Sequence, residues 1–188
     1  MSEFDIQYRP RTAFKGQVVA DFIAEFTHDE DKGAEESLQW SVHTDGSSNR
    51  QAGGAGIVLL SPEGDVVECM VRLDFPTTNN EAEYEALVAG LDLARAAGAT
   101  SVVIYCDSQV ITNQVNRDYE CKGERMKRYL DQVKRRVDDL QAKIIQIPKE
   151  ENEQANHLAK AASAEHMITH GNVFSFFQLS PLIDSSDV

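Results

Sequence analysis

One short apolar segment constrains the fold more than any other feature of this sequence. Residues 101–106 read Ser-Val-Val-Ile-Tyr-Cys, and they are bounded by Gly98 and Asp107. A continuous run of this length, rich in β-branched and aromatic side chains, predicts a strand that is buried on both faces of a sheet. Because such a strand needs helices on both sides, the sequence predicts an α/β domain.

The segments around this strand predict a mixed sheet flanked by helices. The first three strands are expected to form an antiparallel meander, in which Pro62-Glu63-Gly64-Asp65 supplies one turn. The fourth strand returns through a helix and should lie parallel to a neighbour by a right-handed crossover. The prediction is therefore a five-stranded mixed sheet, with three antiparallel strands and then two parallel ones. The expected strands are 38–45, 55–61, 66–73, 101–106 and 143–147, and the expected helices are 80–97, 107–116, 123–140 and 151–164.

Three parts of the chain are expected. Residues 1–37 are interpreted as a connecting segment that contains a possible amphipathic helix, 15–26, and ends in a charged linker, 27–37. Residues 38–164 hold the α/β domain. Residues 165–188 are interpreted as a tail that is partly disordered, because no clear period appears in them.

The cysteines and the apolar runs exclude several classes of protein. The three cysteines are odd in number and widely spaced, which argues against a disulfide framework and a thiolate zinc site and favours a reduced, intracellular compartment. The longest apolar run is 55–60, far short of the ~20 residues that a membrane helix needs. No membrane partner is therefore expected.

The charge is strongly acidic but unevenly distributed. The chain has 31 acidic and 18 basic residues and a formal net charge of −13, which argues against a general nucleic-acid binder. Residues 117–136, here called the basic strip, have a positive net charge, because Arg and Lys outnumber Asp and Glu there. The strip fits two interpretations equally: a solvated helix face, or a surface that follows phosphates.

Three acidic residues lie where surface acids are not expected. Asp45 and Asp107 each end a predicted strand, and if these strands are parallel neighbours both carboxylates lie at the carboxyl end of the sheet, where α/β proteins bind ligands. Glu83 precedes Leu87 by four residues and so falls on the core-facing stripe of its helix, while Glu81 and Glu85 are free to point outward. The alternatives are that each Asp only caps a helix or forms a turn, and that Glu83 reaches solvent at the edge of the stripe.

Converging carboxylates favour a site for hard divalent cations. Oxygen ligands suit Mg²⁺, and two such ions can activate water and stabilise the leaving oxygen at a phosphodiester. The scattered histidines offer no rival metal site, and no phosphate-binding glycine loop occurs. The glycine-rich run 53–56 indicates a hairpin entry instead.

Four sequence blocks resemble the ribonuclease H family over residues 38–164. They occur in family order: Thr44-Asp45-Gly46-Ser47, Thr78-Asn79-Asn80-Glu81-Ala82-Glu83, Cys106-Asp107-Ser108-Gln109 and Asn152-Glu153-Gln154-Ala155-Asn156-His157-Leu158-Ala159. The flanks, with Tyr8-Arg9-Pro10-Arg11-Thr12-Ala13, Val19-Ala20-Asp21-Phe22 and Ser180-Pro181-Leu182-Ile183, resemble the surroundings of this domain in polyproteins of plant gypsy-like LTR retrotransposons.

The resemblance implies a ribonuclease H-like fold and hydrolysis of the RNA strand of RNA–DNA hybrids by two metal ions, with Mg²⁺ as cofactor and Mn²⁺ as a substitute. It implies that Asp45, Glu83 and Asp107 bind metal and act in catalysis, with Asn156 at the fourth ligand position. Asn80 and Gln109 match positions that read the minor groove of the hybrid, and Ser108 and Thr78 are further candidates for substrate contacts.

Two departures from the family pattern bear on activity. Asn156 stands where the fourth ligand is usually Asp, so one ion should be held weakly and activity should fall; either drift or a deliberate change accounts for it. The loop before the last helix, 148–152, lacks the His of several relatives, and Glu150 is a candidate replacement.

Two further functions remain open. The domain is also compatible with a non-catalytic tether or hybrid-binding module of a retroelement polyprotein, or with an interaction module that grips a partner through residues 15–26 and the Phe-rich tail. The resemblance implies an RNA–DNA hybrid and the reverse transcriptase domain of the same polyprotein as partners. It also implies a location in cytoplasmic retroelement particles or in the nucleus.

Overall fold

The structure is a computed structural model that describes residues 39–117, 123–164 and 173–184. The predicted connecting segment, its helix at 15–26 and its linker lie outside the described residues. Within the described ranges, none of the helices combines the length and apolar character needed to cross a bilayer. The elements in chain order are β1 (Gln39–Ser48), β2 (Gly53–Leu60), β3 (Val66–Leu73), α2 (Asn79–Ala96), β4 (Ser101–Cys106), α3 (Gln109–Arg117), α4 (Glu124–Leu140), β5 (Lys143–Gln146), η3 (Lys149–Glu151), α5 (Glu153–Ser163), β6 (Val173–Gln178) and η4 (Leu182–Asp184).

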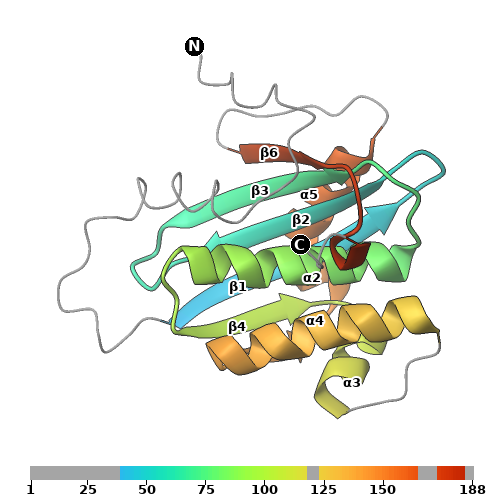
Figure 1. Cartoon of the computed structure of the whole chain (residues 1–188). Helices are drawn as coiled ribbons and strands as arrows, with labels where there is room; N and C mark the ends of the chain where they lie inside the picture. Colours follow the sequence, from blue (N-terminus) through green and yellow to red (C-terminus); the bar gives the residue numbers. More distant parts are fainter. Residues whose placement is uncertain (1–38, 118–122, 165–172, 185–188) are drawn as a thin grey trace.

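A single mixed sheet with the strand order β5-β4-β1-β2-β3-β6 organises the domain (Figure 1). Strands β1, β2 and β3 form the predicted antiparallel meander. Strand β4 lies parallel to β1, and β5 lies parallel to β4. The α/β fold class and the predicted order of antiparallel and then parallel strands are confirmed.

The sheet has six strands, one more than the five predicted. The additional strand, β6, comes from the expected tail and lies parallel to β3, with Phe174 opposite Cys69. Its apolar residues do alternate in contact: Phe174 and Phe176 pack against the main core, whereas Val173 packs on the other face of the sheet. The alternation is hard to recognise in the sequence because the last two residues reverse the usual pattern. The polar Gln178 is buried, whereas the apolar Phe177 is only partly buried. The expected boundary at residue 164 stays a prediction.

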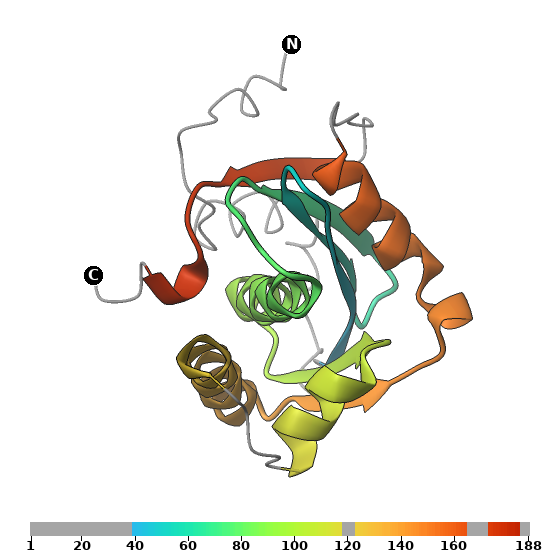
Figure 2. The same ribbon diagram turned by 90° about the vertical axis from the view of Figure 1, so that its right-hand side faces the viewer.

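Helices cover both faces of the sheet, as Figure 2 shows with α2 and α4 on one side and α5 on the other. The larger core lies under α2, where Ile57 of β2 and Leu91 of α2 are fully buried. On the opposite face α5 comes so near that a Cβ on Gly56 would lie 2.2 Å from the Ala155 carbonyl oxygen. The glycine-rich run 53–56 is therefore the first half of β2, and its missing side chains let α5 rest on the strand backbone.

Helix α2 begins with a capping box. The Thr78 side chain accepts a hydrogen bond from the Glu81 backbone N–H, and the Glu81 carboxylate accepts one from the Thr78 N–H, both at 3.1 Å. Glu81 also pairs with Arg125 of α4 at 3.0 Å. The expectation that Glu81 points outward is therefore wrong, because the carboxylate serves both the helix terminus and the neighbouring helix.

Glu85 is also buried rather than outward, and it joins three elements. Its carboxylate accepts hydrogen bonds from the Tyr129 hydroxyl at 2.5 Å, the Gln178 amide at 2.8 Å and the Leu182 backbone N–H at 3.0 Å. Burial raises the pKa of Glu85, and these hydrogen bonds oppose the increase. The prediction that Glu85 points outward is wrong because its three hydrogen-bond donors lie far away in the sequence, where the local helical pattern does not reveal them.

Replacing Glu85 by Ala is expected to reduce the free energy of unfolding by about 2–4 kcal/mol, because two buried donors and one part-buried donor lose their acceptor. Urea unfolding followed by circular dichroism measures the loss. Glu63→Ala is the matched control, since Glu63 is exposed in the β2–β3 turn and should change stability by less than about 0.5 kcal/mol. Equal stabilities of the two variants would show that the Glu85 contacts do not stabilise the fold.

Candidate functional site

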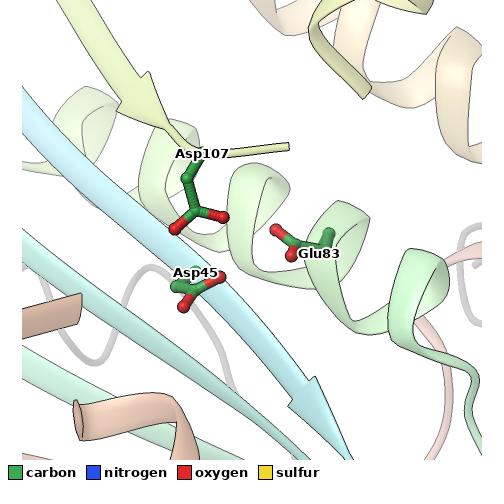
Figure 3. Close-up of side chains that lie close together, drawn as sticks. All are labelled: Asp45, Glu83 and Asp107. Atoms are coloured by element: carbon green, nitrogen blue, oxygen red, sulfur yellow. The ribbon is translucent and has the colours of Figure 1, made fainter. Parts of the chain in front are cut away.

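Three carboxylates from separate segments meet at the carboxyl end of β1 and β4 (Figure 3). Asp107 directly follows β4, as predicted, whereas β1 continues to Ser48, so Asp45 lies within its strand and not at the predicted end. The parallel register pairs His43 with Tyr105, so both Asp side chains leave the sheet at the same edge. Glu83 reaches this point from the second turn of α2. The predicted neighbourhood of β1 and β4 is what brings these residues together.

The carboxylates are crowded and largely removed from water. One oxygen of each of Asp45, Glu83 and Asp107 lies within 4.8 Å of the others, and no further cluster of this kind occurs among the described residues. Asp45 is only 2% exposed, whereas Glu83 and Asp107 are partly buried. The expected convergence of the three acids is confirmed, and the alternative in which each Asp is only a turn or cap residue does not describe this arrangement.

A glycine makes the approach of Glu83 possible. A Cβ on Gly46 would lie 2.3 Å from the carbonyl carbon of Ala82 and 2.4 Å from the backbone nitrogen of Glu83. The backbone of β1 therefore contacts the backbone of α2 at the turn that carries Glu83. The Gly46 N–H also donates to Asp45 Oδ1 at 2.9 Å. The sequence analysis placed this glycine only as the residue after Asp45.

Two asparagines of the α5 region complete the site from the opposite face of the sheet. Asn156 Nδ2 donates to Asp45 Oδ2 at 2.7 Å, so the predicted fourth position does lie beside the cluster, with its amide N–H toward the acid. Asn152 Nδ2 donates to Asp107 Oδ2 at 3.1 Å. The sequence analysis missed Asn152, although its place four residues before Asn156 puts it one helical turn away.

Burial and mutual repulsion shift the protonation of these acids. Burial raises the pKa of Glu83 to about 9, with further increases from the charges of Asp45 and Asp107. Burial likewise raises the pKa of Asp45, against the hydrogen bond from Asn156. A bound divalent cation removes this repulsion, and an all-oxygen donor set is the kind that Mg²⁺ and Mn²⁺ prefer. The residues present therefore fit a hard metal ion.

The other predicted site residues surround the cluster in different ways. Asn80 and Gln109 are exposed in the first turns of α2 and α3. Ser108 accepts a hydrogen bond from the Ile111 N–H at 3.2 Å and so begins α3, while Thr78 caps α2. Glu150 is exposed in η3 and is not part of the carboxylate cluster. The substrate contacts of these residues stay predictions.

The basic strip falls mainly on α4, although residues 118–122 lie outside the described part of the chain. Arg125 pairs with Glu81, and Arg136 pairs with Asp92 at 2.7 Å, so both join α4 to α2. Lys127, Arg128 and Arg135 are exposed. The strip thus supports the packing of two helices and also presents positive charge to solvent.

Comparison with known families and proteins identifies relatives of this chain. The reverse transcriptase-like family matches residues 43–162. Ribonuclease HI from Halobacterium salinarum is 29% identical over 126 residues, which are 64% of this chain and 62% of that protein. The chain spans less than two thirds of the length of the curated relatives that it matches first.

Solved structures match the same part of the chain. The N-terminal RNase H domain of rv2228c from Mycobacterium tuberculosis, solved as a fusion with maltose binding protein, has a TM-score of 0.63 and 26% identity, and the match covers 68% of this chain and 100% of that one. LC11-RNase H1, isolated from compost and solved in complex with an RNA/DNA hybrid, has a TM-score of 0.58 and 25% identity over 64% of this chain and 94% of that one.

The raised pKa of Glu83 predicts how stability depends on pH and metal. A carboxyl group whose pKa is higher in the folded state stabilises the fold at low pH, and this contribution disappears between the unfolded value of 4.5 and about 9. In EDTA the free energy of unfolding should therefore fall from pH 6 to pH 9, by at most about 1.4 kcal/mol per pH unit from this group.

Thermal unfolding with and without Mg²⁺ measures this effect. The Mg²⁺-dependent increase in Tm should be larger at pH 8.5 than at pH 6, because metal ligands must lose their protons. Glu83→Gln removes the titrating group and should flatten both dependences. If wild type and Glu83→Gln show the same slopes, Glu83 does not titrate in this range.

Proposed function

We infer the function from the family: this chain belongs to the reverse transcriptase-like family, whose match covers residues 43–162, and it has a ribonuclease H-like fold. We propose that the domain is an endonuclease that hydrolyses the RNA strand of RNA–DNA hybrids. The carboxylate cluster of Asp45, Glu83 and Asp107 is the observation that carries this proposal. Its named relatives include ribonucleases H, and one structural neighbour was solved with an RNA/DNA hybrid.

The cluster supports metal-dependent phosphodiester hydrolysis. Asp45, Glu83 and Asp107 would hold Mg²⁺, or Mn²⁺ in its place, since their oxygens converge and repel one another. Two bound ions would supply an activated water and stabilise the leaving oxygen. The protein's own part is to hold the three carboxylates in a partly buried, low-dielectric site where their attraction for cations is strong.

Asn156 makes this site weaker than a four-carboxylate site. Its amide is neutral, and in this structure its N–H rather than its oxygen is directed at Asp45. Serving as a metal ligand requires the amide to turn so that Oδ1 faces the ion. We therefore propose a reduced affinity for one ion and a reduced rate of hydrolysis.

Hybrid binding would use both exposed amides and exposed cations. We propose that Asn80 and Gln109, with Ser108 and Thr78, contact the minor groove, where 2′-hydroxyl groups distinguish RNA from DNA. The exposed Lys and Arg side chains of α4 would contact the phosphates of the nucleic-acid backbone. Because the chain as a whole carries −13 charges, binding should depend on this local strip and fall steeply with salt.

A non-catalytic role is the second candidate, and the Asn156 amide is the observation that favours it. In that case the domain would act as a tether or hybrid-binding module. For either role we propose a retrotransposon polyprotein of the plant gypsy-like class as the context. The reverse transcriptase domain is then the proposed partner, and the proposed location is a cytoplasmic particle or the nucleus.

The Asp45→Asn variant separates these two roles. Removing the buried charge should reduce Mg²⁺-dependent cleavage of a labelled RNA–DNA hybrid by about a hundredfold or more, while single-stranded RNA stays uncut. Asp65→Asn is the control, because Asp65 is an exposed turn residue. Hybrid binding by wild type without any cleavage, unchanged in Asp45→Asn, would support the tether instead.

Restoring a carboxylate with Asn156→Asp should increase the cleavage rate by about ten- to a hundredfold at fixed Mg²⁺. The same variant should lower Tm in EDTA, since a fourth carboxylate then faces Asp45, and raise Tm in Mg²⁺. Gln154→Glu adds the same charge at an exposed position of α5 and should change neither value. An unchanged rate in Asn156→Asp would mean that position 156 does not limit activity.

A further inference from the structure

We infer that Asn152 is a positioning residue that holds Asp107 and the end of β1 in the arrangement that binds metal. The inference rests on the proposed function of the site. Asn152 lies immediately before α5 and is not one of the three acidic residues that form the carboxylate cluster. It is 1% exposed, which is unusual for an asparagine at a helix terminus.

The ordinary explanation of an asparagine at this position does not apply. Asn152 is the N-cap of α5, and its backbone carbonyl accepts the first helical hydrogen bond from the Asn156 N–H at 3.0 Å. An N-cap side chain normally accepts a hydrogen bond from the first turn. The Asn152 side chain makes no such bond, whereas Thr78 does so at the start of α2. The amide is therefore placed for something other than capping.

Both side-chain hydrogen bonds of Asn152 run from its amide nitrogen into the site. Nδ2 donates to the Thr44 carbonyl oxygen at 2.9 Å and to Asp107 Oδ2 at 3.1 Å. Both partners are acceptors, so the opposite orientation of the amide would set three oxygens against one another. Oδ1 is left buried with no partner among the described residues. The Asn152 amide thus satisfies two acceptors of the site, while its own Oδ1 atom accepts no hydrogen bond among the described residues.

These two contacts connect the two strands that carry the clustered aspartates. Thr44 is the residue before Asp45, so one amide joins the β1 backbone at Asp45 to the side chain of Asp107 beyond β4. One helical turn later, Asn156 donates to Asp45 itself. The beginning of α5 therefore limits the separation of both aspartates, and a carboxylate held in this way loses less freedom when it binds a cation.

The test compares Asn152→Ala with Asn49→Ala in the full chain. Asn49 is a matched control because its Nδ2 also anchors this helix, at the other end, by donating to the Ser163 carbonyl oxygen at 2.8 Å, and it does not touch the cluster. Calorimetric titration with Mn²⁺ gives the metal affinity, and urea unfolding gives the stability of each variant. Hybrid cleavage as a function of Mg²⁺ concentration gives kcat and the Mg²⁺ requirement separately.

We expect Asn152→Ala to weaken Mn²⁺ binding by about ten- to a hundredfold and to raise the Mg²⁺ concentration for half-maximal cleavage accordingly. Asn49→Ala should stay within about twofold of wild type in both measurements, even where its loss of stability is similar. A loss of affinity in Asn152→Ala no greater than in Asn49→Ala overturns the inference, as does a wild type that does not bind Mn²⁺.

The failure of the proposed function gives a different result. If wild type binds Mn²⁺ but cuts no hybrid, and Asn152→Ala still weakens Mn²⁺ binding, the positioning role stands and the nuclease proposal falls. Asn152→Ser replaces Asn152→Ala if the latter does not fold, because a shorter polar side chain also loses the reach to Asp107. The same change in affinity is then expected, and wild-type affinity in Asn152→Ser overturns the inference.

Discussion

Three acidic side chains, which repel one another when ionised, have oxygens within 4.8 Å of one another, and this is the constraint on which the structure depends. Burial raises the pKa of both Asp45 and Glu83, and the charges of the neighbouring acids raise these pKa values further. A fold that keeps such a cluster needs rigid elements behind each carboxylate. Strands β1 and β4 supply two of these elements, and helix α2 supplies the third.

Helix α2 meets this need through three glutamates that have three different roles. Glu81 closes the capping box and pairs with α4, and Glu83 enters the cluster. Glu85 binds Tyr129, Gln178 and Leu182, and so joins α2 to α4 and to the C-terminal segment. Glu81 and Glu85, two residues before and two residues after Glu83, thus fix the helix that carries Glu83. Their contacts explain why acidic side chains are buried near the beginning of α2.

The opposite face of the sheet contributes through direct backbone contact. The absence of a side chain at Gly56 lets α5 rest on β2, and this places Asn152 and Asn156 next to the aspartates. Both helices therefore meet at one edge of the sheet, α2 with a carboxylate and α5 with two amides. A ribonuclease H-like domain of this kind thus brings the three carboxylates of the cluster together through the packing of its sheet and helices.

The sequence by itself determined the mixed α/β class and the meander, because periodicity is a local property that the chain displays directly. The convergence of Asp45, Glu83 and Asp107 was predicted from the resemblance to a known family and from the expectation that the strands before Asp45 and Asp107 are parallel neighbours. Only the tertiary structure decided that β6 joins the sheet, that Glu81 and Glu85 are buried, and that Asn152 faces Asp107. Each of these depends on a partner distant in sequence, such as Arg125 for Glu81 or Gln178 for Glu85. Local pattern cannot specify which distant donor will satisfy a polar group, since that is settled when the helices and strands pack.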